Sequence, residues 1–236
     1  AISYPTAPLS NVVEDLNRKL QDGTAGLTFT GRSRYLQSAI RALQLPLDSQ
    51  LLVFSKTSLQ RQLIDPPTPR ALFFNDRVVL AWVRDGDLLE AAAHDERMGI
   101  VFYSLEQRPV QRPMFKREFR CLGCHMTGDT LGVPGLLMFS TTPETGDRPT
   151  KIVPTDQRSP IAERWGGWFV TGNRGAAQHL GNRVPALERH PGGDVASVEG
   201  LFDPDGFRGM SSDIAALLTF SHQTHMINLL TRASWE

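Results

Sequence analysis

Both cysteines of this 236-residue chain lie in one pentapeptide, Cys121-Leu122-Gly123-Cys124-His125. This spacing is the attachment signature of a c-type haem, in which each thiol adds to one vinyl group of the porphyrin. A two-residue gap lets one helical turn present both sulfurs to neighbouring edges of the same macrocycle, and the histidine that follows then lies beneath the iron. The sequence therefore predicts one covalent haem on Cys121 and Cys124, with His125 as the axial ligand on the attachment side.

Three other uses of a Cys-x-x-Cys pair fit this sequence less well. A structural zinc site needs about four Cys or His ligands, and the sequence has no second Cys-x-x-Cys or His-x-x-x-His pair to supply the rest. A thioredoxin-like redox pair follows a buried strand, whereas residues 117–120, Arg-Glu-Phe-Arg, are poor strand formers. A plain structural disulfide explains neither the spacing nor the adjacent histidine.

The second axial position of the iron decides whether a haem only passes electrons or also binds small molecules. A helical wheel of the C-terminal segment places His222 and His225 in one apolar arc. The other members of this arc are Ile214, Ala215, Leu218, Met226, Leu229 and Leu230. A buried imidazole must find a hydrogen-bond or metal partner, which makes His222 the first candidate for the second ligand.

Other occupants of that position stay open. The histidines could instead bond a backbone carbonyl or a haem propionate. The alternative ligands are His225, His179 in a loop, a methionine (Met126, Met138, Met210 or Met226), or none, which leaves an open or water-bound iron.

Aromatic and basic side chains beyond the pentapeptide could also contact a haem. Trp165 and Trp168 flank two glycines and form a flat aromatic patch that either packs on the macrocycle or fills the core. Arg164, Arg174 and Arg183 could pair with the propionates, because a guanidinium group matches a carboxylate, although an exposed position is the ordinary role of arginine.

The helices and strands that must position the candidate haem residues can be predicted from the sequence, and together they indicate an α+β fold. Apolar spacing predicts helices at 11–22 and 33–44, and a third helix from about Ser211 to about Leu230. Short β-prone runs, separated by turn residues such as Asn75-Asp76 and Asp85-Gly86, predict an antiparallel meander after the first two helices. These runs are 51–55, 71–75, 77–83, 88–94 and 99–105.

A segment rich in Pro and Arg, 107–117, interrupts the regular pattern and predicts a boundary between two subdomains. Residues 1–106 are expected to hold the helices and the meander, and residues 107–236 the haem region. Most of the second part is irregular before the C-terminal helix. Haem proteins accommodate such loops because the rigid, largely apolar macrocycle takes the place of a side-chain core.

Composition excludes some functions, and the haem-attachment motif indicates a compartment. Lys plus Arg and Asp plus Glu both number 25, so no overall basic field would collect nucleic acid. No stretch reaches the roughly 18 consecutive apolar residues of a membrane helix, so we expect no integral membrane segment. Because covalent haem attachment occurs on the outer side of the bacterial inner membrane, we expect an exported protein, periplasmic or at the cell surface, whose leader has been removed.

Four blocks of the sequence resemble a family of exported bacterial monohaem c-type cytochromes of uncharacterised function. They are PRALFFNDRVVLAWV, FRCLGCHMTGDTLGVPG, RWGGWFVTGNRG and SHQTHMINLLTRA, and the resemblance spans most of the chain. It implies that Cys121, Cys124 and His125 are haem residues, it favours His179 and His222 among the other histidines, and it implies no substrate. Small soluble c-type cytochromes differ, because they usually carry the motif near the N-terminus of an all-helical domain.

The function expected first is electron transfer by a haem that cycles between ferric and ferrous iron. Its partner would be a redox protein or a small-molecule electron donor or acceptor. A haem enzyme that acts on peroxide or a small oxidisable molecule is the second hypothesis, and it needs an open iron position with a nearby acid or base. A haem-based sensor is the third, in which the β-rich N-terminal half contacts a partner.

Overall fold

A six-stranded antiparallel sheet forms the centre of the structure, a computed structural model that describes residues 4–142, 151–173, 175, 177–184 and 198–236. The strands are β1 (Leu51–Val53), β2 (Arg70–Phe74), β3 (Val78–Trp82), β4 (Leu88–Asp95), β5 (Gly99–Glu106) and β6 (Lys116–Arg117). Their order in the sheet is their order in the chain, so the predicted meander is confirmed. β6, which pairs with β5, was not predicted because its two residues are polar.

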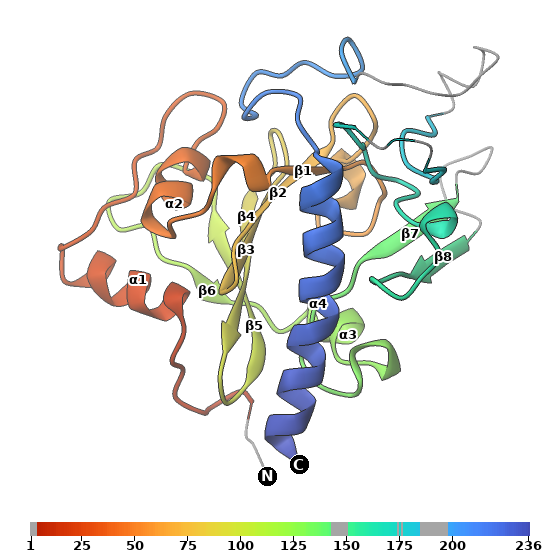
Figure 1. Cartoon of the computed structure of the whole chain (residues 1–236). Coiled ribbons are helices and arrows are strands. Elements are labelled where there is room, and N and C mark those ends of the chain that lie inside the picture. Colours follow the sequence, from red (N-terminus) through yellow and green to blue (C-terminus); the bar gives the residue numbers. More distant parts are fainter. Residues whose placement is uncertain (1–3, 143–150, 174, 176, 185–197) are drawn as a thin grey trace.

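Helices cover both faces of this sheet (Figure 1). α1 (Val12–Gln21) and α2 (Leu36–Ala42) lie on one face, and α4 (Ile214–Trp235) lies on the other. Beside α4 are the short α3 (Leu122–His125) and the hairpin of β7 (Phe139–Thr142) and β8 (Lys151–Pro154). Single 3-10 turns occupy Leu47–Ser49, Arg61–Leu63, Gly128–Thr130 and Ile161–Glu163. The α+β class and the C-terminal helix are therefore confirmed.

Local sequence explains where the long helices begin. The Asn11 side chain accepts hydrogen bonds from the first free amides of α1, and Asp213 accepts one from Ala215 N (2.8 Å) at the start of α4. Between β3 and β4, Asp85 adopts a left-handed conformation (φ 57°), as expected of a tight Asp-Gly turn. Within the described residues, no helix combines the length and the hydrophobicity that crossing a membrane requires.

Successive side chains of a strand point to opposite faces of the sheet, and this alternation produces two buried clusters, one on each face. Tyr103 of β5 belongs to the first core cluster, under α1 and α2, whereas its neighbour Phe102 belongs to the second core cluster, under α4. Phe169 joins the first cluster and Trp168 joins the second, so both clusters contain residues from before and after position 107. The boundary between two subdomains at residue 106 stays a prediction. Residues from both sides of this boundary pack together in each of the two core clusters.

Candidate functional site

One short turn of helix, α3, carries the whole pentapeptide. Cys121 precedes its first residue, and the amides of Cys124 and His125 both bond the carbonyl of Cys121 (3.1 and 2.9 Å). The two thiols are free rather than joined in a disulfide; Cys121 is half-buried and Cys124 is exposed. The predicted single turn is present, and it brings the two cysteines, three residues apart, into one helical turn.

His125 is held in a defined orientation by its neighbours. Its Nδ1–H donates to the carbonyl oxygen of Gly135 (3.0 Å), because a carbonyl can only accept, and the amide of Gly135 donates back to the His125 carbonyl (2.9 Å). The ring of Phe102 packs on the imidazole with centroids 4.8 Å apart. Within the described residues Nε2 makes no hydrogen bond. This tautomer leaves the Nε2 lone pair for a metal.

The carbonyl that accepts from His125 belongs to a segment fixed against α4. Asn228 accepts from the amide of Leu136 (2.9 Å) and donates to its carbonyl (2.8 Å), so the two residues exchange a pair of hydrogen bonds. The neighbouring Pro134 carbonyl accepts from Ile100 N of β5 (2.9 Å). A side chain at Gly135 would collide with the Asn228 amide, which explains the glycine.

The surroundings of His125 and Cys121 favour the neutral form of each side chain. Burial lowers the pKa of His125, which favours the neutral imidazole that a metal requires. Burial, with the nearby carboxylates of Glu90 and Glu118, raises the pKa of the Cys121 thiol to about 12. Glu90 is paired with Arg70 (2.9 Å), and the two arginines Arg70 and Arg120 partly offset the two carboxylates that act on Cys121.

The C-terminal helix buries a different face from the one expected. Its buried residues are Leu217, Phe220, Ser221, Thr224, His225, Ile227, Asn228 and Thr231. Of the predicted apolar arc, only His225 is buried, and the expectation that His222 is buried beside it is wrong. The buried face packs Leu217, Phe220 and Ile227 in the second core cluster, and two of its polar groups find partners there. Asn228 bonds Leu136, and the Ser221 hydroxyl contacts the sulfur of Met138 (3.1 Å).

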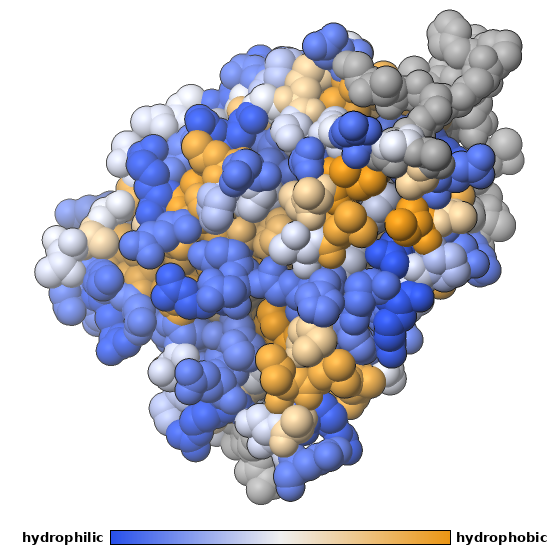
Figure 2. All heavy atoms as spheres, viewed as in Figure 1, coloured by the Kyte–Doolittle hydropathy of each residue, from blue (hydrophilic) through white to orange (hydrophobic). Residues whose placement is uncertain are grey.

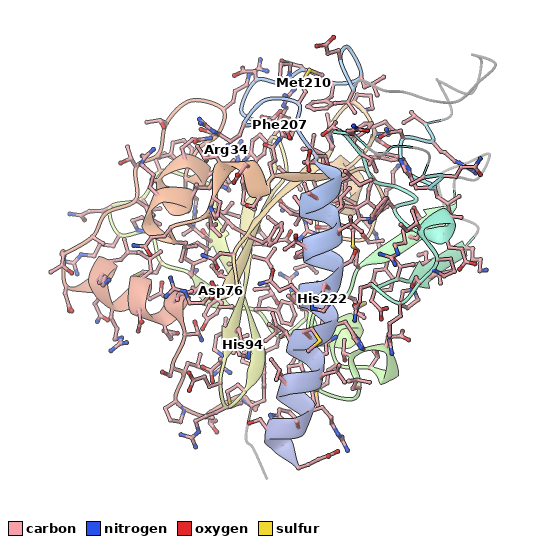
Figure 3. All side chains as sticks on the ribbon, in the orientation of Figure 1. Arg34, Asp76, His94, Phe207, Met210 and His222 are labelled. Carbon is pink, nitrogen blue, oxygen red and sulfur yellow. The ribbon has the colours of Figure 1, made fainter. Side chains whose placement is uncertain are left out.

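Five of the other seven residues of the predicted arc form a largely exposed apolar strip, here called the outer arc of α4. It consists of Leu218, His222, Met226, Leu229 and Leu230. His222 itself is exposed on α4 (Figure 3) and has no hydrogen bond or ion pair within the described residues. Figure 2 shows apolar side chains gathered over the C-terminal half of α4 and the adjoining α3 region. There, Met126 (44% exposed) and Leu131 (37% exposed) follow the pentapeptide.

The other candidate ligands have identifiable surroundings. His225 lies with its Nδ1 3.5 Å from a carboxylate oxygen of Asp156. His179 is buried, and its ring packs edge-on against Trp165 with centroids 5.4 Å apart. Met138 is buried, Met210 and Met226 are half-buried, and Met126 is exposed.

The two tryptophans pack in the second core cluster, which also contacts Cys121 and Leu122. Trp165 is fully buried, and Trp168 donates from Nε1 to the carbonyl of Phe139 (2.7 Å). They act as core residues behind the pentapeptide.

The arginine predictions have different outcomes. The guanidinium group of Arg164 donates from Nε to the carbonyl of Ser159 and from Nη2 to the carbonyl of Gln157 (both 2.8 Å), so these donors bond backbone within the chain. Arg183 is exposed, and Arg174 lies outside the described residues.

Sequence reasoning missed the residues that support His125. Phe102 looked like an ordinary strand residue, and Asn228 was one of many polar residues on the C-terminal helix. Nothing in the sequence singled Asn228 out, because a polar helix residue must find a hydrogen-bond partner only if the helix turns it inward. Gly135, in a Gly-Val-Pro-Gly stretch, was noted only as part of an irregular segment.

The residues present fit a covalent haem. Two free thiols lie on one turn, a neutral imidazole has a free Nε2, and apolar surface adjoins them. Among the described residues, no three His, Cys, Asp or Glu side chains are grouped to hold a bare metal ion. A haem iron needs only axial ligands from the protein, because the porphyrin supplies four nitrogens.

Comparison with known proteins does not extend this picture. No protein-family model matches the chain, and no curated protein or solved structure is similar enough to count as a match. The candidate function therefore depends on the pentapeptide and its surroundings.

Proposed function

We propose that this chain is an exported c-type cytochrome with one covalent haem, which transfers single electrons to or from a redox protein or a small molecule. The observation that carries the proposal is the hydrogen bond from His125 Nδ1 to Gly135 (3.0 Å), on the same turn as two free cysteines. A metal-ligating histidine typically donates its other ring N–H to a carbonyl or carboxylate, which fixes the tautomer and orients the ring.

Each residue has a separate task in this proposal. Cys121 and Cys124 form the two thioether bonds, and His125 ligates through Nε2. The bound haem supplies a one-electron iron couple. Phe102 holds the imidazole from the sheet, and apolar side chains exclude water from the faces and edges of the macrocycle, which lowers the local dielectric.

His222 is the proposed second axial ligand. It is an exposed imidazole without a partner in the described residues, on an apolar strip that a macrocycle would cover. Its neighbours Leu218 and Leu229 would otherwise stay exposed to water. His225 already faces Asp156 across 3.5 Å, and His179 packs against Trp165, so both have surroundings that explain them without iron.

The attachment is tested by expressing the chain with an export leader in a host that matures c-type cytochromes. We expect a haem-stained band after denaturing electrophoresis and its loss in the double variant Cys121→Ala/Cys124→Ala. A wild-type protein without covalent haem would overturn the proposal. Staining of the periplasmic fraction, rather than the cytoplasmic one, tests the location.

The axial ligands are tested by optical and electron-paramagnetic spectra of the ferric protein. We expect a low-spin wild type and a high-spin His222→Ala variant, while His225→Ala and His179→Ala, the matched controls, stay low-spin. If His222→Ala stays low-spin, the assignment of that ligand is wrong. A high-spin wild type that binds cyanide or peroxide would instead favour the haem enzyme or the sensor.

A further inference from the structure

We propose that Asn228 is a positioning residue for the axial ligand: by holding the Gly135–Leu136 peptide, it keeps the Gly135 carbonyl on His125 and so sets the reduction potential. This inference rests on the proposed function, because it concerns the strength with which His125 would ligate iron. It adds a residue from α4, more than 100 positions along the chain from the pentapeptide.

The contacts form a continuous chain from α4 to the imidazole. Asn228 is 3% exposed and uses both ends of its amide on one residue, Leu136 (2.9 and 2.8 Å). Gly135, next along the chain, exchanges two hydrogen bonds with His125, one from the ring and one from its own amide (3.0 and 2.9 Å). Four hydrogen bonds thus join Asn228 to His125 through two residues.

The segment at 134–136 has little freedom to move, because side chains and backbone pack closely around it. A Cβ on Gly135 would meet the Asn228 amide and the Cβ of Thr130. From the opposite side, Ile100 N bonds the carbonyl of Pro134 (2.9 Å). Without the Asn228 side chain, the Gly135–Leu136 peptide keeps no side-chain anchor within the described residues except the His125 ring itself, and the Gly135 carbonyl can move relative to Nδ1.

The expected direction follows from the chemistry of imidazole. A hydrogen bond from Nδ1–H to a carbonyl gives the ring partial imidazolate character, which raises the basicity of Nε2. A stronger donor stabilises ferric iron over ferrous iron, so it lowers the reduction potential. Weakening this hydrogen bond should therefore raise the potential.

A second polar residue of α4 provides the control. Thr224 is also buried on the inner face, but its hydroxyl donates to the carbonyl of Ser221 (3.1 Å) in its own helix. Thr224→Val removes a buried polar group from the same helix without touching the segment at 134–136. A general effect of loosening α4 would appear in both variants.

The test uses the haem-loaded protein and the variants Asn228→Leu and Asn228→Ser, the second being short enough to fold if leucine is not accommodated. Redox titration should give a higher midpoint potential in both, and proton NMR should show faster solvent exchange of the His125 Nδ1 proton. Thr224→Val should change neither. An unchanged potential and exchange rate in the Asn228 variants, or equal shifts in Thr224→Val, would overturn the inference. Absence of covalent haem in the wild type is a different result, which overturns the proposed function itself.

Discussion

Phe102 and His125 pack their rings at 4.8 Å, with planes inclined by 53°, and this contact joins the pentapeptide to the central sheet. Phe102 is only 6% exposed. Replacing a buried Phe by Ala typically removes about 3 to 5 kcal/mol of stability, through lost burial and the cavity left behind. We therefore expect Phe102→Ala to lower the free energy of unfolding of the holoprotein by about 3 kcal/mol, measured by urea titration.

Phe119→Ala is the matched control for this variant. Phe119 lies two residues before Cys121 and is 45% exposed, so its removal should cost less than about 1 kcal/mol. Equal losses in the two variants would show that Phe102 gives no particular support to the pentapeptide.

Neutralising either member of the Arg70–Glu90 ion pair should shift the reduction potential, in opposite directions for the two residues. The two side chains are 19% and 12% exposed, and both charges act on Cys121 and His125. Removing the negative charge with Glu90→Gln should raise the reduction potential, because ferric iron carries the extra positive charge. Arg70→Gln should lower it, and redox titration measures both.

A distant carboxylate serves as the control for these charge changes. Asp15 on α1 lies across the sheet and is about half-exposed, so solvent and salt screen its charge. Asp15→Asn should leave the potential unchanged. Shifts in the same direction for Glu90→Gln and Arg70→Gln would contradict an electrostatic cause.

The two thiols should differ in reactivity before haem is attached. The thiolate is the nucleophile, and a pKa of about 12 leaves roughly one part in ten thousand of Cys121 ionised at about pH 8. Cys124 is exposed. We expect iodoacetamide to label Cys124 first in the cytoplasmic, haem-free protein, as read by peptide mass spectrometry. Equal labelling rates, or faster labelling of Cys121, would contradict the environment described for the two thiols. The control is the protein unfolded in urea, in which we expect both cysteines to react at the same rate.

Tyr103 predicts a loss of stability in alkaline solution. Its hydroxyl exchanges hydrogen bonds with Asn11, and burial raises its pKa above the ordinary range. Since an unfolded tyrosine titrates near pH 10, this stability is complete below about pH 10 and falls above it, by up to about 1.4 kcal/mol per pH unit. Urea titrations at about pH 9 and about pH 11 measure the slope. Tyr103→Phe should reduce it, leaving the part due to Tyr4, whose pKa burial raises to about 12; an unchanged slope would contradict the assignment.

Much of the fold could be predicted because its strands are local in sequence. The runs at 71–75, 77–83 and 99–105 are β-prone, and turn residues between them allow only hairpin connections. β7 and β8 were missed because a long polar stretch of sequence separates them, and their pairing with each other could not be read from either segment alone. The single turn of α3 followed from the chemistry of the pentapeptide rather than from helix propensity.

The orientation of α4 could not be predicted from hydrophobic spacing. Spacing favours burying Leu218, Leu229 and Leu230, yet the structure buries Asn228 and Thr224 and leaves these leucines exposed. The inward face packs Leu217, Phe220 and Ile227 against the sheet, and its Asn228 bonds Leu136, which lies far away in sequence. An apolar arc turned outward is the feature expected where a nonpolar group outside the polypeptide completes the surface.

That feature yields a direct test of where the macrocycle lies. Leu229 of the outer arc and Leu47 in the turn before β1 are similarly exposed, at 40% and 43%. If a haem covers the outer arc, Leu229→Asn places a polar group beside it and admits water, which favours ferric iron and lowers the reduction potential. Leu47→Asn lies beyond the reach of such an effect and should leave the potential at the wild-type value in redox titrations. Identical reduction potentials in the wild type, Leu229→Asn and Leu47→Asn would mean that the haem lies away from the outer arc. The assignment of His222 as the second axial ligand would then be wrong.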